Sequence, residues 1–342
     1  MKKLCVLVLA LAMLLCATSA LAEAATNALT FTGLGPSIQV DTPITANEPY
    51  QIAFITKNMT NPGLVAQLEG AGKACEEFGC EIVKLAPATA DSVEEQVTLV
   101  DDMIQMGVDG ILIHCADSNG IMPAVRRAEE AGIPIIGIGT VPAEETLMRT
   151  GPDYVASGYA MGEYVADKLA GEGTVIILEG APGAQNSTER LNALEDVFSD
   201  YPGIEIVASQ TANWKRVEAM SVMENLLQKY SDVDAVIALN DEMAVGALQA
   251  IQAANLSDIM IFGFDGNADC AAAIKDGTIT ATYNTDGYGA GYVGVSYMVQ
   301  YLNDGTLPPQ YHMPFPSPDA EDVIIDSTNI DDYLENDAWF NY

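Results

Sequence analysis

Short apolar runs alternate along the chain with longer segments in which apolar residues recur at helical spacing. The runs are rich in Val and Ile and are bounded by turn-forming residues, which is typical of strands buried on both faces. The predicted strands cover residues 51–55, 81–85, 110–114, 133–138, 174–178, 204–209, 235–239 and 260–264.

The segments between these strands predict helices. Leu64 and Leu68 begin one helical repeat, and Val97, Val100 and Ile104 belong to the next. Alternation of strand and helix predicts parallel sheets covered by helices. Because so many units exceed one sheet, we predict an α/β fold of two doubly wound lobes, with a boundary near residues 151–153.

The N-terminus has the pattern of a secretory signal. Two lysines precede the apolar run 4–15, and Ala20 and Ala22 supply the small residues of a cleavage site. The run is too short to span a bilayer. We predict cleavage after Ala22 and export to the periplasm or cell envelope. The alternatives are an uncleaved anchor and lipid attachment at Cys16, although the residues before Cys16 lack the small side chain normally required there.

Composition narrows the classes of partner. Asp and Glu number 48 against 14 Lys and Arg, a formal net charge of -34. Such a chain repels polyanions, so binding to nucleic acid or to an anionic membrane is not expected. After signal cleavage roughly 320 residues remain, enough for two domains of ordinary size.

Cysteine and histidine are too sparse to predict a metal site. Removal of the signal leaves Cys75, Cys80, Cys115 and Cys270 without a CxxC pair, and the chain has only two histidines. Cys75 and Cys80 could form a disulfide in an oxidising compartment, or remain free thiols. No phosphate loop, nucleophile elbow or plausible nucleophile–base pair is present. We therefore expect neither a cofactor nor an enzyme.

Ligands of doubly wound sheets bind beyond the carboxyl ends of the strands, so the polar residues of those loops are the candidates. These are residues 58–61, His114, 139–140, 180–190, 213–214, 240–241 and Asp265.

Several segments resemble a known family. The sequences LNDEMAVGALQAIQAA at 239–254 and FGFDG at 262–266 are similar to those of the type I periplasmic sugar-binding proteins, in particular the ribose binders. The resemblance extends over about residues 51–302 and includes TNPGLVAQLEGA at 60–71 and SQTANWKRVEAMSVMENLL at 209–227. The related LacI-type repressors would carry an N-terminal helix-turn-helix, whereas here an export signal stands in its place.

The resemblance implies two Rossmann-like lobes joined by three crossing strands, with the ligand in the cleft between them. It implies capture of a sugar or polyol and delivery to an ABC permease, and we expect a monomer. The resulting division is a signal peptide at 1–22, a tether at 23–48, a first lobe at 49–152 and 286–313, and a second lobe at 153–285 and 314–342.

The resemblance also implies roles for residues of the second lobe. Arg190 corresponds to the arginine that donates to sugar hydroxyls, and Trp214 to the aromatic residue that stacks on the sugar ring. Asn240 and Asp265 correspond to an amide and a carboxylate that hydrogen-bond hydroxyls. Asn240 and Asp241 are both good helix caps; we assign Asn240 to the ligand and Asp241 mainly to the cap.

At the hinge, either Asn284 or Thr285 falls where the family has a glutamine or asparagine. In the first lobe Asn61 matches the family's asparagine. Thr140 follows Gly139 where ribose binders have an Asp-Arg pair.

His114 replaces an asparagine of the ribose binders, and its role is left open between ligand contact and structural hydrogen bonding. Gly63 and Leu64 replace two phenylalanines. Because the first lobe departs from the pattern in these ways, a solute other than ribose is expected.

Three other functions remain open on the sequence. The protein could be a sensory component read by a chemoreceptor or histidine kinase, it could bind a nucleoside or an autoinducer-like molecule, or it could be an enzyme built on this scaffold.

Overall fold

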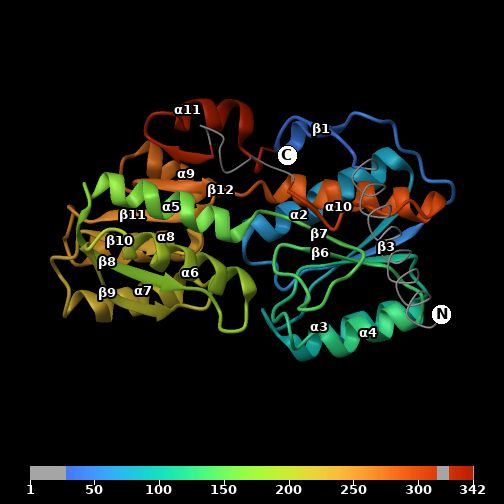
Figure 1. Ribbon diagram of the computed structural model, residues 1–342, viewed down its shortest axis with the longest axis horizontal. Helices are drawn as coiled ribbons and strands as arrows, with labels where there is room; N and C mark the ends of the chain where they lie inside the picture. Colours follow the sequence, from blue (N-terminus) through green and yellow to red (C-terminus); the bar gives the residue numbers. More distant parts are fainter. Residues whose placement is uncertain (1–27, 314–322, 342) are drawn as a thin grey trace, which may run out of the picture.

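The computed structural model describes residues 28–313 and 323–341 and forms two α/β lobes that lie side by side (Figure 1). Each lobe contains one six-stranded sheet with helices on both faces. The prediction of two doubly wound lobes is therefore confirmed. The predicted signal at 1–22, with Cys16, lies outside the described residues, as does segment 314–322.

The sheet of the first lobe is wholly parallel, in the order β4-β3-β5-β6-β7-β13. Along β3, Ile52 and Phe54 pack toward α2 and α10, whereas Ala53 and Ile55 pack toward α3 and α4. The strands are β3 (Gln51–Ile55), β4 (Glu81–Leu85), β5 (Gly110–Ile113), β6 (Ile135–Ile138), β7 (Met148–Thr150) and β13 (Tyr311–His312), and the helices are α2 (Pro62–Phe78), α3 (Val93–Met106), α4 (Met122–Glu130) and α10 (Gly287–Asp304).

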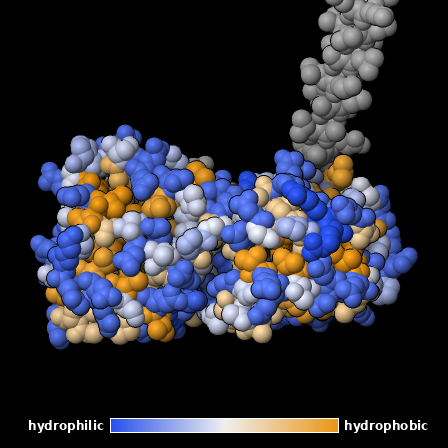
Figure 2. Space-filling model, turned by 90° about the horizontal axis from the view of Figure 1, so that it is seen from below, coloured by the Kyte–Doolittle hydropathy of each residue, from blue (hydrophilic) through white to orange (hydrophobic). Residues whose placement is uncertain are grey.

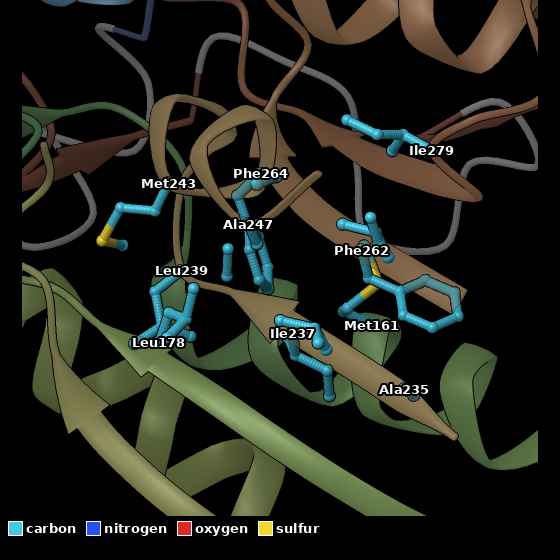
Figure 3. Close-up of a cluster of buried hydrophobic side chains, with 14 of the residues drawn as sticks. Met161, Leu178, Ala235, Ile237, Leu239, Met243, Ala247, Phe262, Phe264 and Ile279 are labelled. Atoms are coloured by element: carbon cyan, nitrogen blue, oxygen red, sulfur yellow. The ribbon is translucent and has the colours of Figure 1, made fainter. Parts of the chain in front are cut away.

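The sheet of the second lobe has the order β14-β12-β11-β10-β8-β9, with only the edge strand β14 antiparallel. Figure 3 shows Leu178, Ile237 and Phe262 from three neighbouring strands gathered in its core. The strands are β8 (Glu172–Glu179), β9 (Gly203–Thr211), β10 (Ala235–Ala238), β11 (Met260–Asp265), β12 (Ala281–Asn284) and β14 (Ile324–Asp326), and the helices are α5 (Tyr154–Lys168), α6 (Gln185–Ser199), α7 (Arg216–Leu227), α8 (Asp241–Ala253), α9 (Ala268–Lys275), α11 (Ile330–Asp332) and the π-helical turn η2 (Tyr333–Asp337).

The eight predicted strands are all present, with ends that differ from the prediction by a residue or two. Strands β7, β12, β13 and β14 of the two large sheets were not predicted; they are short and lie at or near the sheet edges. In β12 the polar residues Thr282 and Asn284 are buried, so this strand lacks the apolar run by which the other strands were predicted. Within the described ranges, none of the helices has the length and apolar character needed to cross a membrane.

The chain passes from one lobe to the other between β7 and α5, between β12 and α10, and between β13 and β14. Two of these crossings end in capped helices. Asp153 accepts a hydrogen bond from the Ala156 N–H at the start of α5, and Asp286 accepts one from the Gly289 N–H at the start of α10. The caps define where each crossing stops and the next lobe begins.

The segment expected to be a free tether is folded from residue 28 onward. Strand β1 (Phe31–Thr32) pairs with β2 (Gln39–Val40) around a 3-10 helix, η1 (Gly35–Ser37). Leu29 and Ile38 are buried in the first-lobe core. The tether prediction is thus wrong for this part, because a few apolar residues without periodicity can still pack when distant segments provide a surface.

One such distant segment is the C-terminal tail, which the sequence left unplaced. Trp339 is almost fully buried, belongs to the first-lobe core and lies against the backbone of Gly35. Its indole Nε1 donates to the carbonyl oxygen of Asp265 at 2.9 Å. Although β14 lies in the second lobe, Trp339 therefore joins both lobes and does not belong to the second lobe alone.

Candidate functional site

A cavity of about 450 Å³ lies between the lobes, which meet at a waist in Figure 2. Its lining comes from both lobes and mainly from loops that follow the carboxyl ends of strands, as the strand-end argument predicts. The polar and aromatic lining residues include Lys57, Asn58, Asn61, Gln67, Asp91, His114, Tyr154, Arg190, Trp214, Asn240, Asp265 and Thr285.

Arg190 on α6 is buried and held from several sides. Its guanidinium carbon lies 4.3 Å from the ring centroid of Phe264 and 5.0 Å from that of Tyr154, so the planar group is stacked against both rings. One terminal nitrogen, Nη1, donates to the Leu239 carbonyl at 2.6 Å. The Nε–H has no partner among the described residues. Arg190 is thus a fixed donor with unused hydrogen-bonding capacity.

Asp265 ends β11 and faces Arg190, with 3.9 Å between Oδ1 and Nη2. Burial raises the pKa of the Asp265 carboxyl, while the Arg190 charge and a hydrogen bond from the Asn61 side chain lower it. Asp265 has a backbone φ of 124°, which a residue with a side chain rarely adopts. A strained backbone that aims a carboxylate into a cavity is a common feature of binding sites.

Trp214 forms a flat wall of the cavity and also has a positive φ, of 65°. Its ring lies against Gly180: a Cβ added there would come within 2.0 Å of the ring atom Cζ2. The indole Nε1 is buried and has no partner among the described residues. The absence of a side chain at position 180 therefore allows the ring to lie where it does.

Asn240 lines the cavity, but the prediction that Asp241 is mainly the helix cap is wrong. Asn240 is the cap of α8, because its Oδ1 accepts from the Met243 N–H at 3.0 Å. Asp241 is buried and accepts from the Asn267 N–H at 2.7 Å and the Thr282 hydroxyl at 2.6 Å. Burial raises the pKa of Asp241. The amide Nδ2 of Asn240, 3.4 Å from the Trp214 carbonyl, is the group left for a ligand.

Asn61 in the first lobe combines two roles. Its Oδ1 accepts from the Gly63 N–H at 2.8 Å and caps α2, while its amide reaches Asp265 in the second lobe. Asn61 therefore connects the two walls of the cavity.

His114 lies at the cavity with both ring nitrogens engaged. Nε2 accepts from the Thr140 N–H at 3.3 Å, and Nδ1 lies 3.0 Å from Gln67 Oε1. Because a backbone N–H can only donate, the hydrogen of the neutral ring is assigned to Nδ1. Burial, and secondarily the charge of Lys57, lowers the pKa of His114 well below its ordinary value. These contacts favour the structural alternative for His114.

Gly139 leaves the space that the His114 ring occupies. Its φ is 66°, and an added Cβ would lie 2.4 Å from Cε1 of His114. A side chain at position 139 would therefore collide with the imidazole. The glycine at position 139 and the histidine at position 114 therefore fit each other.

Two of the nine predicted site residues do not line the cavity. Thr140 is fully buried and its hydroxyl donates to Asn186 Oδ1 at 3.0 Å. Asn284 is buried at the end of β12, where its Oδ1 accepts from the Asp286 N–H. Thr285, the neighbouring alternative, does line the cavity. The side chains of Thr140 and Asn284 are instead engaged in hydrogen bonds that hold them away from the cavity.

Sequence reasoning missed Lys57, Gln67, Asp91 and Tyr154. Lys57 and Asp91 lie on loops after β3 and β4, so the strand-end argument could have included them. Gln67 on α2 and Tyr154 on α5 lie inside helices, where sequence alone does not tell which face meets the other lobe.

The four cysteines of the described residues are free thiols. The Cys75 and Cys80 side chains contact each other, and the hydrogen bond between them raises the pKa of Cys75 and lowers that of Cys80. Within the described ranges, no group of three His, Cys, Asp or Glu side chains is arranged to hold a metal ion.

Comparison with known proteins agrees with this geometry. The sequence profile of the periplasmic binding protein domain matches residues 52–306. The chain belongs to this family.

Among curated relatives, the ribose import binding protein of Bacillus subtilis is 37% identical over 68% of this chain and 75% of its own length. The xylitol-binding protein of Mycolicibacterium smegmatis is 34% identical over 69% of each chain. A solved solute-binding protein from Actinobacillus succinogenes with bound D-allose superposes with a TM-score of 0.76 at 28% identity. The match covers 83% of this chain and 100% of the other. The family resemblance drawn from the motifs is thereby confirmed.

Proposed function

We propose that the protein is the solute-binding component of an ABC importer and captures a sugar or sugar-like polyol between its lobes. The observation that carries this proposal is the interlobe cavity, in which the fixed donor Arg190, the carboxylate of Asp265 and the flat ring of Trp214 converge. Neutral hydrogen bonds contribute only about 0.5–1.5 kcal/mol each, so a polyol needs several such partners at once.

The relatives named above support the choice of solute class. Their names or bound ligands are ribose, xylitol and D-allose, small molecules rich in hydroxyl groups. We infer that Asn61, Arg190, Trp214, Asn240, Asp265 and Thr285 contact the solute. We assign His114 a structural role in the first-lobe wall, through its contacts with Gln67 and Thr140.

We further propose that the protein is exported, acts as a monomer and releases its solute unchanged to permease subunits. Hinge closure provides the physical means: a solute held by both lobes stabilises the closed form that a permease would recognise.

A ligand screen tests this function. Pentoses, hexoses, polyols and nucleosides are added at millimolar concentration, and the melting temperature of the protein is followed. A ligand that binds only the folded state adds about 2.7 kcal/mol to the free energy of unfolding at a hundredfold excess over Kd, and the melting temperature rises accordingly. The best compound is then recovered and identified by mass spectrometry.

The proposal requires stabilisation by a polyhydroxylated compound, recovery of that compound unchanged, and loss of much of the shift in Trp214→Ala. A screen in which none of these compounds raises the melting temperature contradicts it. A chemically altered compound would point to an enzyme instead.

A further inference from the structure

Lys57 is a buried cation on the first-lobe wall of the cavity. It follows β3 by two residues, only 4% of it is exposed, and its ammonium lies 5.1 Å from the ring centroid of Trp214 in the opposite lobe. Burial lowers the pKa of Lys57, while the negative charges of Asp91 and Asp265 partly raise it again. The first-lobe wall therefore places a buried lysine at the cavity, across from Trp214.

The other charged groups at the cavity are already partnered. Lys215 pairs with Glu218 at 2.8 Å, and Arg216 pairs with Glu242 at 2.8 Å. Asp265 faces Arg190.

The Asp91 carboxylate accepts from Asn58 Nδ2 at 2.7 Å. For the ammonium of Lys57, by contrast, the described residues provide no hydrogen bond and no ion pair within 4 Å. Its surroundings thus lack an acceptor that a bound molecule could supply.

Two further groups on the cavity lining that lack a partner are also donors. The Arg190 Nε–H and the Trp214 Nε1–H are buried without partners among the described residues. With Lys57 they form a set that can donate but cannot accept. A hydroxyl offers lone pairs but brings a hydrogen that needs an acceptor of its own. A carboxylate only accepts, so it matches a donor-only set better.

We propose that the solute is a polyhydroxylated molecule that carries a carboxylate, as a sugar acid does, and that Lys57 is the residue that binds the carboxylate. Lys57 is then the specificity determinant of the site. This inference rests on the proposed function, since it names the class of solute that the same cavity takes. Charge-assisted bonds are roughly twice as strong as neutral ones, which gives such a residue the power to discriminate.

Matched pairs of solutes test the inference by titration calorimetry. Ribose, glucose and galactose are compared with ribonate, gluconate, glucuronate and galacturonate on the wild-type protein. At least one acid is expected to bind about tenfold more tightly than its neutral parent. Raising the ionic strength should weaken the acid and leave the parent unchanged.

Lys57→Met keeps the length of the side chain and removes its charge. It should weaken the acid about 30-fold and the neutral parent less than about threefold. Lys73→Met is the control, because Lys73 lies on the outer face of α2, is well exposed and pairs only with Glu77. It should change neither affinity. The melting transition of each unliganded variant verifies folding, and if Lys57→Met does not fold, the wild-type pairs decide alone.

Tighter binding of the neutral parents by the wild-type protein would overturn the inference and leave the proposed function standing. Equal losses of acid and parent in Lys57→Met would also overturn it. If neither class binds at millimolar concentration, both the inference and the proposed function are wrong.

Discussion

The two walls of the cavity are built differently. In the second lobe, Arg190 is stacked between two rings and Trp214 lies against a glycine, so these groups stand ready before a solute arrives. In the first lobe, His114 uses both nitrogens on its own lobe, and the buried Lys57 has no close acceptor among the described residues. One wall presents groups that are held in place, and the other contains a buried lysine without a close partner among the described residues.

Two residues of the first lobe show how closely its wall is packed. His114 and Gly139 fit each other, since a side chain at position 139 would occupy the space of the imidazole. The residues at these two positions therefore constrain each other.

The largest expected effect is on the second wall. Asp265→Ala should weaken the best solute about 100-fold, because it removes the carboxylate and leaves the buried charge of Arg190 unpaired. Asp269→Ala is the matched control, since Asp269 is exposed and does not line the cavity, although its partner Arg216 does. Calorimetry on both variants measures the effect. Equal small losses would mean that the solute binds elsewhere.

The next effect tests whether the ring of Trp214 is set by its support. In Gly180→Ala the added methyl would meet the indole, so the ring must move and the affinity should fall about three- to tenfold. Gly72→Ala is the control, because its methyl would meet only the flexible end of Lys84. An unchanged affinity in Gly180→Ala would show that stacking on Trp214 contributes little.

A third prediction concerns His114 and stability as a function of pH. Its pKa in the folded protein is lowered by burial, so its contribution is fully present above about pH 6.5 and is lost as the pH falls. Between pH 7 and pH 5, His114→Gln should therefore lose less unfolding free energy than the wild type.

Denaturant titrations at several pH values measure this. Burial also lowers the pKa of His312, and the variant His312→Gln is expected to change the pH dependence of stability less than His114→Gln does. An unaltered pH dependence in His114→Gln would indicate an imidazole that is open to the cavity.

The smallest effect separates two threonines. Thr140→Val should cost about 1 kcal/mol of stability through its lost hydrogen bond to Asn186, and should change solute affinity less than about threefold. Thr285→Val, at the cavity, should weaken the solute more than Thr140→Val does. The reverse order of affinities would return Thr140 to the site.

Much of the fold could be predicted from the sequence because buried parallel strands are continuous apolar runs. Strand β3 with its run Gln51–Ile55 is an example. Strand β12 could not be found in this way, since its buried Thr282 is held by a hydrogen bond to Asp241 from another element. Hydrogen bonds between distant residues leave no periodic signal.

The sequence by itself determined the two-lobed α/β architecture, the family, and the second-lobe groups Arg190, Trp214 and Asp265. Local patterns suffice for these, because periodicity sets the elements and strand ends set the edge at which ligands gather. Only the tertiary structure decided which polar groups remain available. It showed that His114 and Thr140 are occupied and that Lys57 lies across from Trp214. Availability depends on the partners that the fold brings to each side chain, and those partners come from the other lobe or from distant strands.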